Sequence, residues 1–397
     1  MSKTGIAIVG ASMRSIFMFA YLKENPQQGF ITGVYDSIPQ RGRYLLDSYG
    51  FKDGVIYDSL EQAVNDSRCQ AVFIGTPDYA HVEPVRAALA AGKHVYCEKP
   101  LAITLEDCDA IIETAKTAKS VFYLGMNMRH SPVHEKMHQI LTSGQLGRLL
   151  TIEANEYYVG GRTYFRRWNR LRKFGGGLWI TKSCHDFDLL NWFAGGKPRC
   201  VFATSSLSYY KSKPDGGMYC RNCPIKTSCP DFFDVNNPDA SKWPAQFNEL
   251  AKITEKETGQ MQDMCLYNSD KDTFDNGMAI VEYDNDVRAT YTVNVVSART
   301  TRQLRLTGTA AAAEGDMEAA RITVWKRYSD EKTEYNLADE VYGSSHGGAD
   351  SKILDDFFEC CRTGKKPRSS WADGRLGIQV ALAARNSCDT GQKISLK

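Results

Sequence analysis

The sequence predicts an α/β protein in two parts. A doubly wound parallel sheet comes first, followed by an α/β domain with an open, mostly antiparallel sheet. In the first 125 residues, short apolar runs alternate with amphipathic stretches, as in a parallel sheet covered by helices on both faces. Beyond residue 125, strand-like stretches follow one another with few helices between them, which is typical of antiparallel sheets. We therefore predict domains over 1–125 and 126–397.

The elements of the first part follow from the period of the apolar residues. Continuous apolar runs predict strands at Gly5–Gly10, Phe30–Tyr35, Ala71–Gly75, His94–Cys97 and Val121–Gly125. Helical spacing predicts helices near Ser15–Lys23, Arg41–Tyr49, Leu60–Asn65, Val82–Ala91 and Leu105–Thr117. Right-handed crossovers between such strands make this a nucleotide-binding fold.

The second part is predicted in the same way. Helices are expected at Val133–Thr142, His185–Phe193, Ser351–Cys361 and Gly374–Ser387. Strands are expected at Leu149–Tyr158, Cys200–Tyr209, Gly277–Tyr283, Val287–Val296, Arg302–Thr307 and Arg321–Lys326. Residues 211–273 are polar and contain prolines and cysteines, so we interpret them as an irregular insertion. The alanine run at 310–313 is the only low-complexity feature, and no function is attached to it.

Composition narrows the class of protein. Hydrophobic residues make up 42% and charged residues 24% of 397 residues, as in ordinary globular proteins, and not in disordered chains or disulfide scaffolds. The formal net charge of +2 gives no support for a nucleic-acid partner. No apolar run approaches the ~18 residues that cross a bilayer, and no signal peptide is recognised, so we expect a cytoplasmic protein without a membrane partner.

The loop after the first strand is a candidate phosphate site. Gly10 is followed by Ser12 and Ser15, where the dinucleotide motif G-x-G-x-x-G has its second and third glycines. Met13 and Arg14 would open the helix whose N-terminal amides bind a pyrophosphate, with Arg14 adding a charged contact. The alternative is an ordinary turn between a strand and a helix.

Asp36 ends the second predicted strand, 26 positions after Gly10. An acidic residue there accepts hydrogen bonds from the ribose hydroxyls of NAD and repels the 2′-phosphate of NADP. Arg41 and Arg43 lie nearby in the sequence and would weaken that repulsion. NAD is therefore favoured over NADP, and a helix-capping aspartate is the alternative interpretation.

Two further segments follow apolar strands and should lie at the carboxyl edge of the sheet, where such folds bind ligands. They are Gly75–His81 and Cys97–Pro100. The cofactor candidates that they contribute are Thr76, Pro77, His81, Glu98 and Lys99.

These segments resemble the Gfo/Idh/MocA oxidoreductases, the family of glucose–fructose oxidoreductase and inositol dehydrogenase, over essentially the whole chain. The motifs that carry the resemblance are Gly75-Thr76-Pro77 with His81, Ala91–Pro100, Gly125–Arg129, Gly175–Gly177 with His185 and Asp188, and His346–Asp350. The resemblance implies a Rossmann domain followed by an α/β domain whose sheet often forms the subunit interface. We accordingly expect a homo-oligomer assembled through that sheet.

The resemblance also implies roles for single residues. In similar enzymes the lysine matching Lys99 lies near the nicotinamide, the histidine matching His185 contacts the reacting hydroxyl, and Asn127 falls in the cofactor-binding segment. Many members carry an aspartate four residues before that histidine, where this chain has Thr181. The departure suggests a branch that uses Lys182 and His185 as a pair.

The chemistry of that pair can be argued from the residues. Oxidation of a secondary alcohol needs a base, and histidine has the ordinary pKa nearest to neutrality. Lys182 and His185 are three positions apart, so on one helical turn each cation would lower the pKa of the other. Either residue would then be the base. The alternative for His185 is a histidine that only packs in the core.

Substrate contacts are predicted around the triple glycine and beyond it. Aromatic and planar polar side chains suit sugar rings, which present apolar C–H faces and hydroxyl groups. The candidates are Tyr158, Arg162, Tyr164, Trp168, Lys182, Asp186 and His346. Aromatic residues of a core or an interface are the alternative interpretation of this group.

Three cysteines cluster in the insertion as Cys220-x2-Cys223-x5-Cys229, with Cys265 as the nearest later cysteine. The spacing suggests thiolate ligands for a structural zinc ion or, less favoured, an iron–sulfur cluster. Free thiols or a single disulfide are the alternatives.

The sequence as a whole predicts an NAD(H)-dependent dehydrogenase that acts on a ring secondary alcohol of a sugar or glycoside, with C3 of a glucosyl unit as the first candidate. A glycosidase or lyase that oxidises its substrate transiently and recycles bound NAD is a second hypothesis. The third is a nucleotide sensor without catalytic activity.

Overall fold

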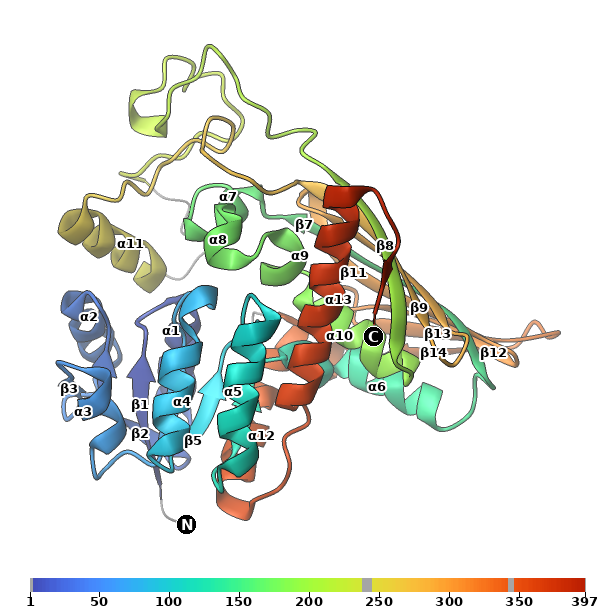
Figure 1. Ribbon diagram of the computed structural model, residues 1–397, viewed down its shortest axis with the longest axis horizontal. Helices are drawn as coiled ribbons and strands as arrows, with labels where there is room; N and C mark the ends of the chain where they lie inside the picture. The colour runs from blue at the N-terminus through green and yellow to red at the C-terminus, as the bar shows by residue number, and fades with distance from the viewer. Residues whose placement is uncertain (1–2, 238–244, 342–345, 397) are drawn as a thin grey trace.

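The computed structural model describes residues 3–237, 245–341 and 346–396. Two sheets lie side by side, and the helices between them join the two halves of the molecule (Figure 1). The predicted fold class is confirmed: a parallel sheet of six strands precedes a mostly antiparallel sheet of nine.

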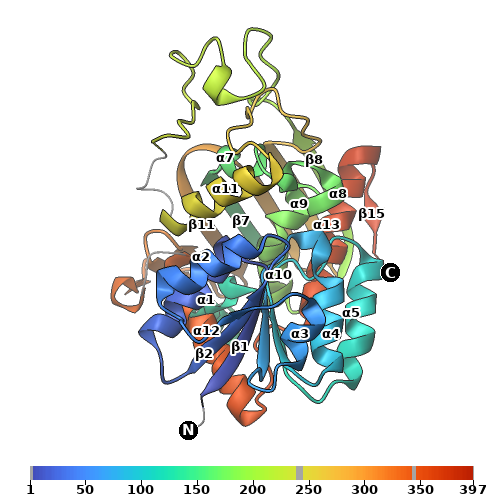
Figure 2. The same ribbon diagram turned by 90° about the vertical axis from the view of Figure 1, so that its left-hand side faces the viewer.

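The first sheet has the strand order β3-β2-β1-β4-β5-β6, and every neighbouring pair is parallel. Its strands are β1 (Thr4–Val9), β2 (Gly29–Tyr35), β3 (Val55–Ile56), β4 (Ala71–Ile74), β5 (His94–Cys97) and β6 (Phe122–Leu124). Its helices are α1 (Met13–Glu24), α2 (Pro39–Tyr49), α3 (Leu60–Asn65), α4 (Val82–Ala90) and α5 (Leu105–Thr117). Helices α3, α4 and α5 pack on one face, and α1 and α2 pack on the other (Figure 2).

Helix α12 (Ala349–Thr363) completes the second face of this sheet, although it comes from the far end of the chain. Phe357 packs edge-on against Tyr96 of β5, with ring centroids 5.4 Å apart. Phe358 stacks on Tyr21 of α1 at 5.7 Å. Residues beyond 126 therefore contribute to the core around the first sheet.

The second sheet has the order β14-β13-β12-β11-β7-β10-β9-β8-β15. Only β7 and β10 pair in parallel, and the other neighbours are antiparallel. The strands are β7 (Leu149–Val159), β8 (Pro198–Ser206), β9 (Asn276–Tyr283), β10 (Arg288–Asn294), β11 (Val296–Gly308), β12 (Ala311–Asp316), β13 (Arg321–Lys326), β14 (Lys332–Asn336) and β15 (Ile394–Ser395).

Helices cover one face of the second sheet, and α13 also contacts α5 of the first half. The helices of this half are α6 (Pro132–Thr142), α7 (Gly161–Tyr164), α8 (Arg172–Gly175), α9 (Leu178–Thr181), α10 (Cys184–Ala194), α11 (Ala245–Thr258) and α13 (Trp371–Thr390). Short 3-10 helices are η1 (Asp78–Ala80), η2 (Asn127–His130), η3 (Trp168–Arg170), η4 (Cys220–Asn222), η5 (Ala338–Glu340) and η6 (His346–Gly348). The exposed side chains of Phe202, Met278 and Ile280 lie on β8 and β9, in the sheet for which self-association stays a prediction.

The insertion and the alanine run differ from the sequence prediction, and β3, β14, β15, α7, α8 and α9 are elements that it did not contain. The insertion is not wholly irregular, because α11 forms within it and packs on α2. The alanine run opens strand β12, which pairs with β11 and β13 on its two sides. Hydrogen bonding to two neighbours outweighs the low strand preference of alanine. None of the helices described is both long and apolar enough to cross a membrane.

Candidate active site

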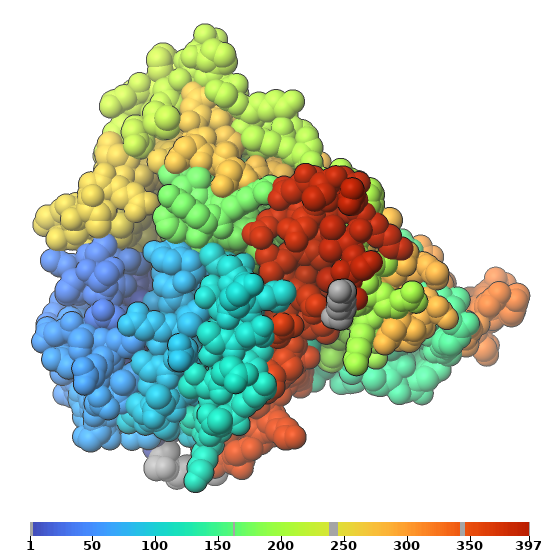
Figure 3. Space-filling model, in the orientation of Figure 1, coloured from blue at the N-terminus to red at the C-terminus, as the bar shows by residue number. Residues whose placement is uncertain are grey.

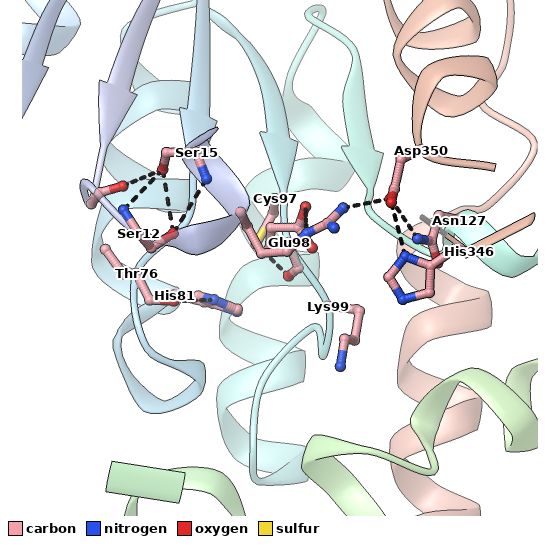
Figure 4. A network of polar contacts seen from close by, with 12 residues as sticks. Ser12, Ser15, Thr76, His81, Cys97, Glu98, Lys99, Asn127, His346 and Asp350 are labelled. Carbon is pink, nitrogen blue, oxygen red and sulfur yellow. Dashed lines mark hydrogen bonds and ion pairs between the residues drawn. The ribbon is translucent and has the colours of Figure 1, made fainter. Parts of the chain in front are cut away.

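The loop after β1 requires a glycine at position 10, both for its backbone conformation and for its contact with the loop after β4. Gly10 has a φ of +90°, and a Cβ atom there would lie 2.8 Å from the backbone nitrogen of Thr76. Ser12 caps α1 by accepting from the backbone N–H of Ser15, whose hydroxyl donates to the Gly10 carbonyl at 2.5 Å (Figure 4). The two serines at the motif's glycine positions therefore hold the loop against the start of α1, which begins at Met13.

Asp36 lies directly after β2 and beside this loop. Its carboxylate accepts from the backbone N–H of Ala11 at 2.7 Å and from that of Ile38 at 2.8 Å. Arg41 lies 3.6 Å from the same carboxylate and donates to the Ala11 carbonyl. Arg43 is exposed on α2. The arrangement places a negative charge next to the loop, as a ribose site requires.

Arg14 points along the carboxyl edge of the sheet and joins two distant segments. Its guanidinium donates to Glu98 at 2.9 Å and to Asp350 at 2.8 Å. Asn127 and His346 also contact the Asp350 carboxylate, each at 2.8 Å (Figure 4). Burial opposes ionisation of Asp350, but Arg14 and His346 hold its pKa well below the usual range. Four predicted site residues that are distant in sequence, Arg14, Glu98, Asn127 and His346, thus meet around the Asp350 carboxylate or its guanidinium partner.

The buried side chain of His81 connects the loop after β4 with the loop after β5. One ring nitrogen contacts the carbonyl of Pro100 at 2.8 Å, and the other contacts that of Thr76 at 3.2 Å. Burial lowers the pKa of His81. The neighbouring Pro77 precedes η1 and fixes the start of that turn. His81 thus positions the loop that carries Lys99.

Lys99 extends from the end of β5 toward the second half of the molecule (Figure 4). Its ammonium donates to the Thr181 carbonyl at 2.8 Å. The Thr181 hydroxyl in turn hydrogen-bonds the buried carboxyl group of Asp78, whose pKa is raised by burial to about 7 although Lys99 lies close by. Sequence reasoning missed Asp78, which supplies a carboxyl group where position 181 lacks one.

His185 lies in the first turn of α10, at the centre of a group of cations. Its ring is buried, and its Nδ1 atom has no hydrogen-bond partner among the residues that the structure describes. The ring of His346 is 6.3 Å away between centroids. Burial, and then the charges of Lys99, Arg302, His346 and Lys182, lower its pKa well below the ordinary value. The imidazole is therefore neutral.

Lys182 does not share a helical turn with His185, contrary to the sequence prediction. Helix α9 ends at Thr181 and α10 begins at Cys184, so the helical backbone is interrupted between Lys182 and His185. The Lys182 ammonium instead pairs with Glu156 of β7 at 2.7 Å and lies 4.2 Å from the centre of the Tyr158 ring.

A buried charge network supports these groups from the sheet. Arg302 of β11 lies opposite Glu156 in the strand register and pairs with it. Arg302 also contacts the Asp186 carboxylate at 3.1 Å. The same carboxylate accepts a hydrogen bond from the Tyr291 hydroxyl at 2.8 Å. Burial would raise the pKa of Glu156, but Arg302 and Lys182 lower it. Burial raises that of Asp186 to about 6. Sequence reasoning found Asp186 and missed Glu156, Arg302 and Tyr291.

The predicted substrate aromatics lie beside this network. Tyr158 and Tyr164 meet edge to face, with centroids 6.3 Å apart, and Tyr164 is buried. Trp168 is half-buried at the start of η3. The side chain of Arg162 lies outside the described part of the chain. Sugar contacts by these residues stay a prediction.

The cysteines of the insertion also come together, away from this site. Cys220, Cys223, Cys229 and Cys265 line one small cavity. All twelve cysteines of the chain are free thiols, so the disulfide interpretation is wrong. Within the described ranges, no three His, Cys, Asp or Glu side chains already stand in a geometry that holds a metal ion.

Comparison with known proteins identifies the chain. Residues 4–126 match the model of an oxidoreductase family with an NAD-binding Rossmann fold, and residues 138–396 match the C-terminal α/β domain of the same family. The chain belongs to the Gfo/Idh/MocA oxidoreductases. It is thus an NAD-binding oxidoreductase by family, and the resemblance expected from its motifs is confirmed.

Individual relatives agree with this family. YteT of Bacillus subtilis (strain 168), a protein named as an oxidoreductase, is 28% identical over 89% of this chain and 88% of its own. Myo-inositol 2-dehydrogenase of Thermotoga maritima is 29% identical over 44% of this chain and 50% of its own. The fold of levoglucosan dehydrogenase, solved with NADH and levoglucosan, superposes with a TM-score of 0.77 over 99% of both chains at 15% identity.

The residues at the carboxyl edge fit NAD. The Gly10 loop packs directly on the backbone of Gly75 and Thr76, which brings the loops after β1 and β4 together at the edge where such folds bind a pyrophosphate. The amide groups at the start of α1 and the carboxylate of Asp36 suit phosphate and ribose groups respectively. The Oδ1 atom of Asn127 is buried and has no partner among the described residues, so a ligand donor would satisfy it.

Proposed function

We propose that this protein is an NAD(H)-dependent dehydrogenase that oxidises a secondary alcohol on the ring of a sugar or glycoside, or reduces the corresponding ketone. The buried Nδ1 atom of His185 carries the proposal. A buried ring nitrogen without a partner costs free energy unless a ligand occupies it. A substrate hydroxyl is the ligand that would donate a hydrogen bond to it.

The charges around His185 suit the developing charge of this reaction. An alkoxide forms when the hydroxyl gives up its proton, and cations placed beforehand around that oxygen stabilise it. Lys99 and Lys182 lie in this part of the site, and their charges act on His185 together with that of Arg302. A sugar alcohol brought to His185 would therefore meet a base and several positive charges at once.

The proposed steps use the chain's own residues. His185 accepts the hydroxyl proton, and Lys99 donates a hydrogen bond to the same oxygen. Glu156 fixes Lys182, and its pairing with Arg302 keeps the two cations in place. NAD bound along the loops after β1, β2 and β5 supplies the hydride acceptor. The alcohol thus loses one proton to His185 and one hydride, leaving a ketone.

Two arguments favour a sugar or cyclic polyol as the substrate class. Tyr158 and Tyr164 present aromatic rings next to the charge network, which suits the C–H faces of a sugar ring. An inositol dehydrogenase is among the relatives at 29% identity. C3 of a glucosyl unit is the first position to test, and NAD is the preferred cofactor because of Asp36.

The test begins with the purified full-length protein and a panel of free sugars, inositols and aryl glucosides. Absorbance of reduced nicotinamide is recorded first without added cofactor, to detect NAD that stays bound, and then with NAD. Mass spectrometry of the same samples follows loss of two hydrogens. The proposal expects both signals with at least one substrate. Silence across the panel in both directions would favour the nucleotide sensor.

Substitution then tests the assignment of the base. His185→Ala should lower kcat by about 10²- to 10⁴-fold, the usual contribution of general acid–base catalysis, and leave NAD affinity close to that of the wild type. His138→Ala is the matched control, because His138 is half-buried on α6 and packs against Trp192 outside the site. Equal turnover in the His185 and His138 variants would contradict the assignment.

One observation favours a second candidate function. Asp78 adds a buried carboxyl group with a pKa of about 7 beside Lys99, and elimination next to a transient ketone needs a second proton-transfer group. A lyase or glycosidase that recycles NAD within one turnover would use it. Release of aglycone from an aryl glucoside without net NADH would identify this reaction and exclude simple oxidation.

A further inference from the structure

The cysteine cavity lies in the insertion, at the end of the molecule where residues 211–237 are found (Figure 3). Its four cysteines come from two stretches of chain that are more than thirty residues apart at their closest, Cys229 and Cys265. A short antiparallel bridge between Tyr219 and Met264 holds those stretches together. The cluster is thus built by the fold and is not only a feature of the sequence.

The bridge places two of the cysteines on one face. Tyr219 and Met264 are directly opposed, so the residues that follow them, Cys220 and Cys265, point to the other face of the pair. Hydrogen bonds from Cys220 N to Asp263 O at 2.9 Å and from Cys265 N to Met218 O at 2.8 Å fix this register. Cys223 follows the single turn of η4 and lines the same cavity. A hydrogen bond from its N–H to the Cys220 carbonyl at 3.2 Å closes that turn.

Hydrogen-bond donors and cations lie around the cavity. The backbone N–H of Gly217 donates to the Cys223 sulfur at 3.3 Å. The Arg166 guanidinium lies 4.0 Å from the Cys220 sulfur, and Lys213 and Lys226 line the cavity. Donors and cations of this kind offset the negative charge of a tetrathiolate centre.

Residues 211–237 need a cross-link to hold a fixed structure, because almost none of them is buried. Within residues 211–237, Cys220 is the only buried residue. That stretch has no helix longer than the three residues of η4. Chains with so little buried apolar surface hold a fixed structure when a metal or a disulfide ties them together, and all of these cysteines are free.

We propose that Cys220, Cys223, Cys229 and Cys265 bind one structural zinc ion in tetrahedral coordination. Four thiolates form the closed donor set that structural zinc prefers. The cavity has a volume of about 10 Å³, close to the room that a single water-sized sphere needs.

Binding requires the sulfurs to turn inward, because they do not stand at ligand geometry as described. The cysteine sulfur is placed by one torsion, χ1, so a rotamer change moves it while the backbone stays fixed. The four cysteines already line the same cavity, so the backbone can remain as it is during closure.

A zinc ion here would also secure a segment next to the active site. Arg166 donates to the Met264 carbonyl at 2.9 Å, between Asp263 and Cys265 of the bridge. Its neighbour Arg167 lies over the ring of Phe247 of α11, at 5.2 Å. The zinc site would thus anchor the chain that leads from Tyr164 to Trp168. The site does not depend on the proposed reaction.

The first experiment measures metal content in the full-length protein, purified without chelator and passed through gel filtration. Mass spectrometry of the elements should find one zinc ion per chain. Cys223→Ser/Cys229→Ser should lose it, and Cys388→Ser should keep it. Cys388 is the matched control because it is half-buried on α13, away from the cavity. Replacement of zinc by Co²⁺ should give the absorption bands of a tetrahedral thiolate site in the wild type and in Cys388→Ser, and not in the double variant.

Each other result would overturn the proposal. Iron with acid-labile sulfide would mean a cluster in place of one zinc ion, and a metal-free protein with four thiols open to a thiol reagent would mean no metal site. Zinc kept by the double variant would place the ion elsewhere. Trypsin gives an independent measurement, because wild-type protein should resist cleavage within 211–237 until a strong chelator removes the zinc.

Discussion

Asp78 allows a quantitative test of the site's electrostatics through Asp78→Asn. The carboxyl group is buried, and burial raises its pKa from the ordinary 3.8 to about 7. Between these two values the folded protein keeps a proton that the unfolded chain loses. Stability therefore falls as the pH rises through this window and is level above it. Asparagine keeps the shape and cannot ionise.

The magnitude follows from the size of this window. One pH unit corresponds to about 1.4 kcal/mol, so ionisation of Asp78 costs about 4 kcal/mol in all, of which about 3 kcal/mol lies above pH 4.5. An unfolding entropy of about 2 cal/mol/K per residue makes the Tm of a chain this long change by roughly 1 °C per kcal/mol. The Tm of Asp78→Asn relative to wild type should thus rise by roughly 3 °C between pH 4.5 and pH 8.

The assay is thermal unfolding of both proteins, followed by circular dichroism at half-unit steps of pH. Every other titrating group is shared, so its contribution cancels in the difference between the two curves. The exposed Asp53 supplies the control variant Asp53→Asn, for which the difference should stay flat. A flat difference for Asp78→Asn as well would refute the inference that burial keeps this carboxyl protonated near neutral pH.

Two more substitutions test the cofactor edge. Arg14→Met should destabilise the protein by about 3–5 kcal/mol, because it leaves the buried carboxylates of Glu98 and Asp350 without their shared guanidinium, and denaturant unfolding at pH 7 would measure this. A decrease in the free energy of unfolding below 1 kcal/mol would show that the ion pairs of Arg14 with Glu98 and Asp350 behave as exposed ion pairs do. Asp36→Asn should lower the preference for NAD over NADP by about tenfold, equivalent to about 1.4 kcal/mol. The preference is measured as the ratio of the kcat/KM values for the two cofactors. An unchanged ratio would mean that Asp36 does not select the cofactor.

Most of the fold could be predicted because its strands are continuous apolar runs or alternate cleanly. Strand β13 has the predicted bounds Arg321–Lys326. Strand β12 could not be predicted in this way, because its alanines carry little strand preference. It is held in the sheet by pairing with β11 and β13, which its own sequence pattern does not show. Helix α11 was hidden in a polar segment, because Leu250 is its only buried residue.

The site could be predicted only where residues cluster in short motifs. Lys99 and His185 were found in this way, whereas Glu156 and Arg302 each stand alone in a strand. A signal for Arg302 does exist in the sequence. It lies in phase with Leu304 on the buried face of β11, and a charge at an inward position needs a buried partner. Which residue serves as that partner depends on strand register, which single-strand patterns do not contain.

Helix α12 has a consequence for how the molecule can be divided and moved. It comes from the C-terminal third of the chain and fills one face of the first sheet with Phe357 and Phe358. A fragment that ends near residue 125 would keep α1 and α2 on that face but expose the part that α12 covers, so the dinucleotide-binding half is not a separable module. Opening of the molecule would have to carry α12 with the first sheet and bend the chain on either side of the helix. Exchange of cofactor and substrate should therefore depend on small loop movements and not on wide separation of the two halves.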